Sequence, residues 1–139
     1  MIGVDLCKVS RIRRVYERYG NRFSKRFLHP GEILDLEIIP HHKVPTFIAT
    51  RWATKEALYK AFGDYRLDFR DVQLVKTSNT GIDDLSLPTR IRNNSKLCIK
   101  THGKLLQLKT RMGINDIHVS ISHDGDYVVA FVTLDKSTL

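Results

Sequence analysis

The sequence predicts an α+β protein in which antiparallel strands pack with one long helix. Residues 2–7 alternate between larger apolar side chains and Gly, Asp or Cys, a pattern typical of a strand. Residues 45–62 are predicted to form one helix, and apolar side chains surround almost its whole circumference. Two further runs meet at Asp124-Gly125, a hairpin signature that makes them antiparallel strands.

Residues 1–139 are predicted to form one domain, since no repeat or low-complexity segment divides them. A chain of this length buries roughly two thirds of its unfolded surface, so a real core is available. No apolar run approaches the ~20 residues that span a bilayer, and we expect no membrane partner. The formal net charge of +8 is large enough to steer an acidic partner, and by itself it does not say whether this is a nucleic acid, an anionic membrane or an acidic protein.

The first strand carries Ile2, Val4 and Leu6 on one face and Asp5 on the other. Ser10 is the candidate cap of the Arg-rich helix that follows, and this helix is predicted to end at Gly20.

The remaining elements follow from the same patterns. A shorter helix is predicted after Pro30, strands within residues 68–76, 88–92 and 96–100, and a short helix that ends at Gly113. Residues 77–88, rich in Ser, Thr, Asp and Gly, have the composition of a loop.

The long helix contains a line of four alanines and two charges on a narrow stripe. The line of Ala49, Ala53, Ala57 and Ala61 predicts close packing against another backbone. Glu56 and Lys60 stand at i and i+4, a pair that any exposed helix can carry for roughly 0.2–0.5 kcal/mol. Because apolar residues border their stripe, however, we expect both charges to have partners.

The first hairpin strand has two different faces. Ile117, Val119 and Ile121 form the apolar face, and the other face carries His118, Ser120 and Ser122, with His123 near the turn. A row of small hydrogen-bond donors suits phosphate oxygens, although a solvated strand face often carries Ser as well.

Basic residues concentrate in the first forty positions. The candidate docking residues for an acidic partner are Arg11, Arg14, Arg22 and Arg26. Solubility explains any one of them, so the case depends on the cluster.

Three motifs carry a resemblance that covers nearly the whole chain: GVDLCKVSRI, RWATKEALYKAFG and IHVSISHDGDYVVAFV. In order and spacing they resemble the holo-acyl-carrier-protein synthases, the short, single-domain type of 4'-phosphopantetheinyl transferase. The resemblance implies the fold of that family and a trimer with sites at subunit interfaces. It also implies Mg²⁺-dependent transfer of the phosphopantetheine arm of coenzyme A to a serine of apo acyl carrier protein, with release of adenosine 3',5'-bisphosphate.

The same resemblance assigns roles to individual residues. It implies that Asp5 and Glu56 bind Mg²⁺, and such hard oxygen ligands suit this ion. The positions that match the coenzyme site are Lys60 and Gly63, with Arg51, Ser120, Ser122 and His123 near the adenosine 3'-phosphate and adenine. Glu56, Lys60 and His118 are the candidate catalytic residues, and either Glu56 or His118 accepts the serine proton.

Two features depart from the family pattern. Lys8 stands where the family usually has an acidic residue, and Gly81 and Pro88 are separated by six residues where the family has a short turn. We therefore assign no function to this loop. These departures and the high pI favour a mitochondrial matrix protein, with the bacterial cytoplasm as the alternative.

Two other functions compete with this one. A small basic nucleic-acid-binding domain would explain the Arg density, but zinc-ligand spacing, a KH-type GxxG and RNP-like aromatic strands are missing from the sequence. Such a module also gives no reason for Glu56 in an apolar helix, and we expect no nucleic-acid partner. A phosphate-transferring enzyme with another substrate differs only in its partner.

Overall fold

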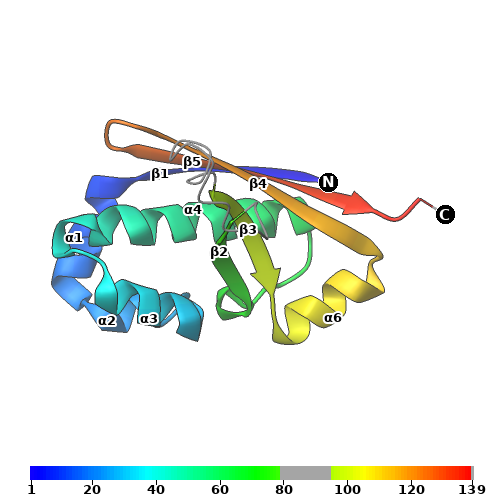
Figure 1. Cartoon of the computed structure of the whole chain (residues 1–139), viewed down its shortest axis with the longest axis horizontal. Coiled ribbons are helices and arrows are strands. Elements are labelled where there is room, and N and C mark those ends of the chain that lie inside the picture. Colours follow the sequence, from blue (N-terminus) through cyan, green and yellow to red (C-terminus); the bar gives the residue numbers. More distant parts are fainter. Residues whose placement is uncertain (79–94, 139) are drawn as a thin grey trace, which may run out of the picture.

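The computed structural model describes residues 1–78 and 95–138. Figure 1 shows their arrangement along the chain. The elements are β1 (Ile2–Lys8), α1 (Val9–Tyr19), α2 (Asn21–Ser24), α3 (Pro30–Ile38), α4 (Val44–Phe62), β2 (Val72–Ser78), β3 (Ser95–Thr101), α6 (Gly103–Arg111), β4 (Ile114–Asp124) and β5 (Tyr127–Lys136), with short 3-10 turns at His41–Lys43 and Phe69–Asp71.

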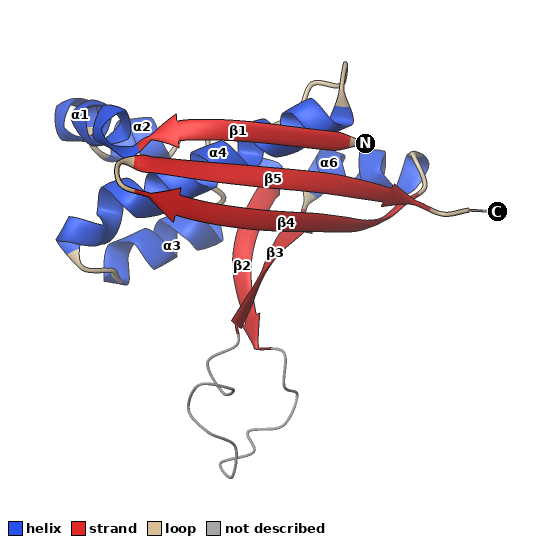
Figure 2. Cartoon of the chain, turned by 90° about the horizontal axis from the view of Figure 1, so that it is seen from above, coloured by secondary structure: helices blue, strands red, loops and turns tan. Residues whose placement is uncertain are grey.

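The strands form two antiparallel sheets. The larger sheet has the order β1-β5-β4, and β2 pairs with β3 in the smaller one. Figures 1 and 2 show that α4 runs along one face of the larger sheet, and that no helix of the described residues covers the other face of this sheet. The predicted α+β class, with a long central helix on an antiparallel sheet, is confirmed.

The alanine line of α4 packs against the backbone of β1, as predicted. Ala49, Ala53 and Ala57 are fully buried. Gly3 of β1 lies so close to α4 that a Cβ added to it would stand 1.9 Å from the carbonyl oxygen of Ala57 and 2.8 Å from the nitrogen of Ala61. Small side chains on both elements therefore set the distance between helix and sheet.

The two faces of the larger sheet differ in exposure. Cys7, Val128, Ala130 and Val132 face α4 and are buried. The larger apolar side chains of β1 lie on the opposite face, where Ile2 is 60% and Leu6 62% exposed. The alternation in the sequence thus predicts the strand, but the bulkier apolar face is the one away from the helix.

The prediction that Ser10 caps α1 is wrong. The helix begins at Val9, and the hairpin turn supplies the cap because Asp126 Oδ1 accepts a hydrogen bond from the Ser10 amide at 3.0 Å. The Asp126 carbonyl accepts from the Val9 amide at 2.8 Å. The predicted end at Gly20 is confirmed, and its φ of 57° suits glycine.

The other predicted elements agree with the structure where it describes them. Helices α3, α4 and α6 and strand β3 lie at the predicted positions, whereas β2 begins only at Val72 and includes Thr77 and Ser78, which are predicted to belong to the loop. The strand predicted at residues 88–92 and most of the loop at residues 77–88, including Gly81 and Pro88, lie outside the described residues. No helix within residues 1–78 and 95–138 is long and apolar enough to cross a membrane.

Candidate active site

Asp5, Lys60 and Glu56 come together where β1 meets the C-terminal half of α4. Asp5 lies on the face of β1 that packs on α4, and its side chain is 16% exposed. Lys60 Nζ donates hydrogen bonds to Asp5 Oδ1 and to the carbonyl of Val4, both at 3.0 Å. Lys60, one of the two helix charges, therefore contacts the acid of the strand.

Glu56 is the unneutralised carboxylate of this cluster. Burial raises its pKa, the nearby charge of Asp5 raises it further, and Lys60 partly opposes both effects. Glu56 makes no hydrogen bond or ion pair with any described residue, while Lys60 is bonded to Asp5. Two carboxylates that share one lysine leave an excess of negative charge, which a divalent cation would neutralise.

Glu56 also lines an aromatic cleft of about 540 Å³. The other lining residues are Phe23, Arg26, Phe27, Trp52, Tyr59, Leu67 and Phe69. Trp52 meets Phe27 edge to face at a ring-centroid distance of 5.0 Å and Phe69 at 5.9 Å. The cleft is therefore an apolar surface with a carboxylate from α4 and a guanidinium from Arg26 on its lining.

The predicted docking arginines lie on α1, on α2 and just after α2, and all four are exposed. Arg22 and Arg26 line a second depression together with Val15, Tyr19 and Phe23. Because Arg26 lines both cavities, the basic surface continues into the cleft that contains Glu56.

Three of the predicted site residues on the hairpin, His118, Ser120 and Ser122, lie on the other face of the larger sheet. In the strand register Ser120 stands opposite Phe131, whereas Asp5 stands opposite Ala130. His118, Ser120 and Ser122 thus share the face away from α4, and His118 Nε2 donates to Asp135 Oδ2 at 2.9 Å. One chain therefore does not bring these residues to Asp5 and Glu56.

His123 and Arg51 also stand apart from the cluster, whereas the Gly63 amide donates to the Lys60 carbonyl at 3.3 Å. His123 is exposed next to the hairpin turn. Arg51 projects from another side of α4, where its guanidinium carbon lies 3.6 Å from the ring centre of Phe47 and its side chain is 12% exposed. Gly63 ends α4 with a φ of 78°, so the helix terminus itself accounts for glycine there.

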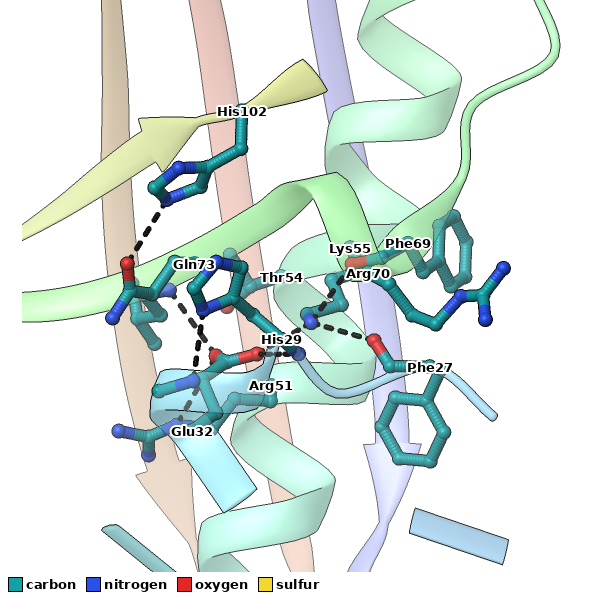
Figure 3. A network of polar contacts seen from close by, with 12 residues as sticks. Phe27, His29, Glu32, Arg51, Thr54, Lys55, Phe69, Arg70, Gln73 and His102 are labelled. Carbon is teal, nitrogen blue, oxygen red and sulfur yellow. Dashed lines mark hydrogen bonds and ion pairs between the residues drawn. The ribbon is translucent and has the colours of Figure 1, made fainter. Parts of the chain in front are cut away.

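Sequence patterns do not predict the buried ion pair between Lys55 and Glu32, which Figure 3 shows. Both residues are fully buried, and Lys55 Nζ lies 2.5 Å from Glu32 Oε1. Burial lowers the pKa of Lys55, and Glu32 opposes that shift. A lysine among apolar residues of a helix was the available signal, but its partner on α3 is 23 residues away.

Comparison with known proteins agrees with this architecture. Residues 1–132 match the model of the 4'-phosphopantetheinyl transferase superfamily. The chain therefore belongs to the 4'-phosphopantetheinyl transferase superfamily.

Individual relatives narrow the class. The chain is 31% identical over 138 residues to the holo-[acyl-carrier-protein] synthase of Maridesulfovibrio salexigens, with 97% of each chain covered. The crystal structure of the Neisseria meningitidis synthase is similar with a TM-score of 0.77 and 30% identity, covering 97% of both chains. The Helicobacter pylori synthase, solved in complex with coenzyme A, has a TM-score of 0.72 and 25% identity and covers 97% of this chain and 100% of its own.

The predicted family, fold and enzyme class, holo-[acyl-carrier-protein] synthase, are thus confirmed. None of these three relatives supports the mitochondrial matrix, and the compartment stays a prediction.

Proposed function

We propose that this protein transfers the 4'-phosphopantetheine arm of coenzyme A to a serine of apo acyl carrier protein and releases adenosine 3',5'-bisphosphate. The observation that carries the proposal is the cluster of Asp5, Glu56 and Lys60 at the junction of β1 and α4. It combines an excess of carboxylate charge with a lysine, which suits a diphosphate substrate bound together with a cation. The relatives' names and the coenzyme A complex of one of them support the same reaction.

The residues of the cluster fit Mg²⁺. Asp5 and Glu56 supply hard oxygen ligands, and burial together with the nearby charge of Asp5 raises the pKa of Glu56 against the opposing effect of Lys60. In the described part of the chain no group of three or more His, Cys, Asp and Glu could hold a metal. We therefore expect phosphate oxygens and water to complete the coordination. The ion, when bound, would offset charge on the diphosphate.

The chain's own groups account for the remaining requirements of the reaction. Lys60 can bind a phosphate oxygen, since its side chain is half exposed and flexible. The serine oxygen forms a bond to the phosphorus nearest the pantetheine arm, and the bond from that phosphorus to the oxygen bridging to the bisphosphate breaks. Glu56 is the group of the cluster that can take the serine proton, directly or through a water. His118 of the same chain lies on the opposite face of the sheet.

A complete site requires a second copy of the chain. Ile2, Val4, Leu6 and Phe131 expose between 43% and 62% of their surface on the outer face of the larger sheet, next to Ser120 in the register. An apolar face of this kind marks an interaction surface. We propose that it packs against neighbouring copies in a homotrimer, so that His118, Ser120, Ser122 and His123 of one copy meet Asp5, Glu56 and Lys60 of the next.

The coenzyme and the carrier would approach this interface from different sides. We propose that the two serines, His123 and Arg51 hold the adenosine 3'-phosphate and adenine, and that Gly63 lines the coenzyme site beside Lys60. The acidic carrier would meet Arg11, Arg14, Arg22 and Arg26. Because Arg26 lines the same cleft as Glu56, a carrier bound there can present its serine to the cluster.

The decisive experiment is to incubate the protein with coenzyme A, Mg²⁺ and an apo acyl carrier protein and to weigh the carrier. A mass increase equal to one phosphopantetheine group, with equimolar adenosine 3',5'-bisphosphate, is the expected result. An unmodified carrier, tested with several carrier proteins, would contradict the proposal.

A further inference from the structure

The Lys55–Glu32 pair connects four segments of the chain. Besides Glu32 Oε1, Lys55 Nζ contacts the carbonyl oxygens of Phe27 at 2.7 Å and Phe69 at 3.0 Å. Glu32 Oε1 accepts from the His29 amide and Oε2 from the Leu74 amide of β2, at 3.0 and 3.1 Å. The three N–H donors of the ammonium group therefore all have acceptors, and both carboxylate oxygens are occupied.

The two carbonyls bound by Lys55 belong to residues that form the cleft beside Glu56. The rings of Phe27 and Phe69 both line the cleft, and Trp52 packs between them with edge-to-face contacts. Lys55 directly precedes Glu56 on α4. In Figure 3 the Lys55 side chain extends from α4 toward the main chain at Phe27 and Phe69.

A pair that served stability alone would not need this placement. Removing two charges from water is costly, and well-packed apolar residues often stabilise a core as well as a buried ion pair does. The charged hydrogen bonds from Lys55, by contrast, hold the main-chain carbonyls of Phe27 and Phe69 in position. The geometry thus favours a positional role.

We propose that Lys55 and Glu32 form a positioning pair, which holds the main chain at Phe27 and Phe69 so that these rings and Trp52 shape the cleft beside Glu56. This inference rests on the proposed function, because the cleft matters for the rate only if the carrier serine reaches Glu56 across it. Neither residue touches substrate in this scheme. Their effect on the reaction passes through the cleft.

The test uses the full chain and two changes that remove charge from the pair. Lys55→Met alone would leave the Glu32 carboxylate buried without its lysine, and such a variant could simply fail to fold. The double variant Glu32→Gln with Lys55→Met removes both charges together. Glu32→Gln alone retains an acceptor for the Leu74 amide. This single variant replaces the double variant in the test if the double variant does not fold. Lys104→Met, at an exposed lysine of α6, is the matched control.

Trp52 is the only tryptophan of the chain, so its fluorescence reports the cleft independently of activity. We expect the folded double variant to show a red-shifted Trp52 emission and stronger quenching by acrylamide. We also expect kcat for transfer to fall by about 10- to 100-fold, the scale of a small misplacement of reacting groups. All measurements are made well below each variant's own melting temperature, and Lys104→Met is expected to match the wild type.

Two results would overturn the inference: an unchanged Trp52 emission, whether or not kcat falls, and an unchanged kcat. A lowered melting temperature with wild-type emission and kcat would mean that the pair is merely structural. If the wild-type protein fails to modify any carrier, the proposed function fails, while the Trp52 measurements still decide whether the pair shapes the cleft.

Discussion

At the scale of single residues, the carboxylates of Asp5 and Glu56 are predicted to be needed for metal binding and for transfer. Replacing a residue that only hydrogen-bonds to a metal ligand already lowers metal affinity or activity by about 10- to 100-fold. Asp5→Asn and Glu56→Gln should therefore each lower the transfer rate by more than about 100-fold. The assay is carrier modification followed by mass spectrometry.

A second measurement separates metal binding from catalysis. Mg²⁺ with coenzyme A should raise the melting temperature of the wild type, and this increase should shrink in both variants. Glu37→Gln, at an exposed position of α3, is the control. If Asp5→Asn and Glu56→Gln both modify the carrier at the wild-type rate, Glu56 has no role in metal binding or transfer.

Gly3 is predicted to be the most sensitive position of β1. A methyl group there would overlap the Ala57 carbonyl, because the Cβ would lie 1.9 Å from that oxygen. Gly3→Ala should therefore reduce the free energy of unfolding by about 3 kcal/mol or more, measured by urea denaturation. Lys8→Ala, at an exposed site of the same strand, should change it by less than about 0.5 kcal/mol. Equal stability of the two variants would mean that strand and helix can separate without cost.

At the scale of elements, the N-terminus of α3 is predicted to make stability depend on pH. His29 Nδ1 accepts from the Gly31 amide, and its ring stacks on His102 at 4.2 Å. Burial lowers the pKa of His29 below 6.5, the charge of His102 lowers it further, Lys55 does the same, and Glu32 and Asp71 oppose the shift. Between the folded and unfolded pKa values only the unfolded chain binds the proton. Stability is therefore lost as the pH falls below about 6.5.

This pH dependence is measured as the melting temperature about one pH unit above and one below 6.5. His29→Asn keeps a capping acceptor but cannot titrate, so the difference between the two temperatures should be smaller in this variant. The same difference in wild type and variant would assign the effect to other groups.

Helix α1 is predicted to guide the carrier. Reversing Arg11 and Arg14 to Glu should raise the KM for the carrier by about tenfold and flatten its salt dependence, because such contacts act on encounter and are screened over roughly 8 Å at physiological salt. The KM for coenzyme A should stay nearly constant. Reversal of the exposed Lys100 and Lys104 gives the same change in net charge elsewhere. Loss of oligonucleotide binding with unchanged carrier kinetics would instead favour a nucleic-acid partner.

Helix ends and turns are predicted well from the sequence where neighbouring residues alone determine them. Gly20 ends its helix and Asp124-Gly125 forms its hairpin because the turn geometry depends on those residues themselves. The predicted cap of α1 is wrong because the Ser10 amide donates to Asp126, which is 116 residues away in the sequence. Lys55 lies among apolar residues of its helix, but only the fold identifies its buried partner as Glu32 of α3. Hydrophobic periodicity therefore does not predict contacts between segments that are distant in the sequence.

At the scale of the whole molecule, the predicted site residues divide into two groups on opposite faces of one sheet. Asp5, Glu56 and Lys60 lie on the face covered by α4, and Ser120 and Ser122 on the exposed face. The three motifs indicated one site by resemblance, and the sequence could not indicate how many chains build it. If each site takes one group from each of two copies, two inactive variants should restore each other.

Co-expression of Asp5→Asn with Ser122→Glu tests this directly. Each variant alone should be inactive, the first through its lost ligand and the second through repulsion of a phosphate. Each interface is head to tail, so in a random equal mixture of the two variants about a quarter of all interfaces receive both intact groups, and about a quarter of wild-type activity should return. Co-expression of Asp5→Asn with Glu56→Gln is the matched control: both changes damage the same group, and no mixture can repair it.

Sedimentation should show trimers in every case, and a Leu6→Glu variant should be a folded, inactive monomer, because it places a charge on the exposed apolar face. Activity that stays absent in the first mixture while trimers form would mean that each chain builds its site alone.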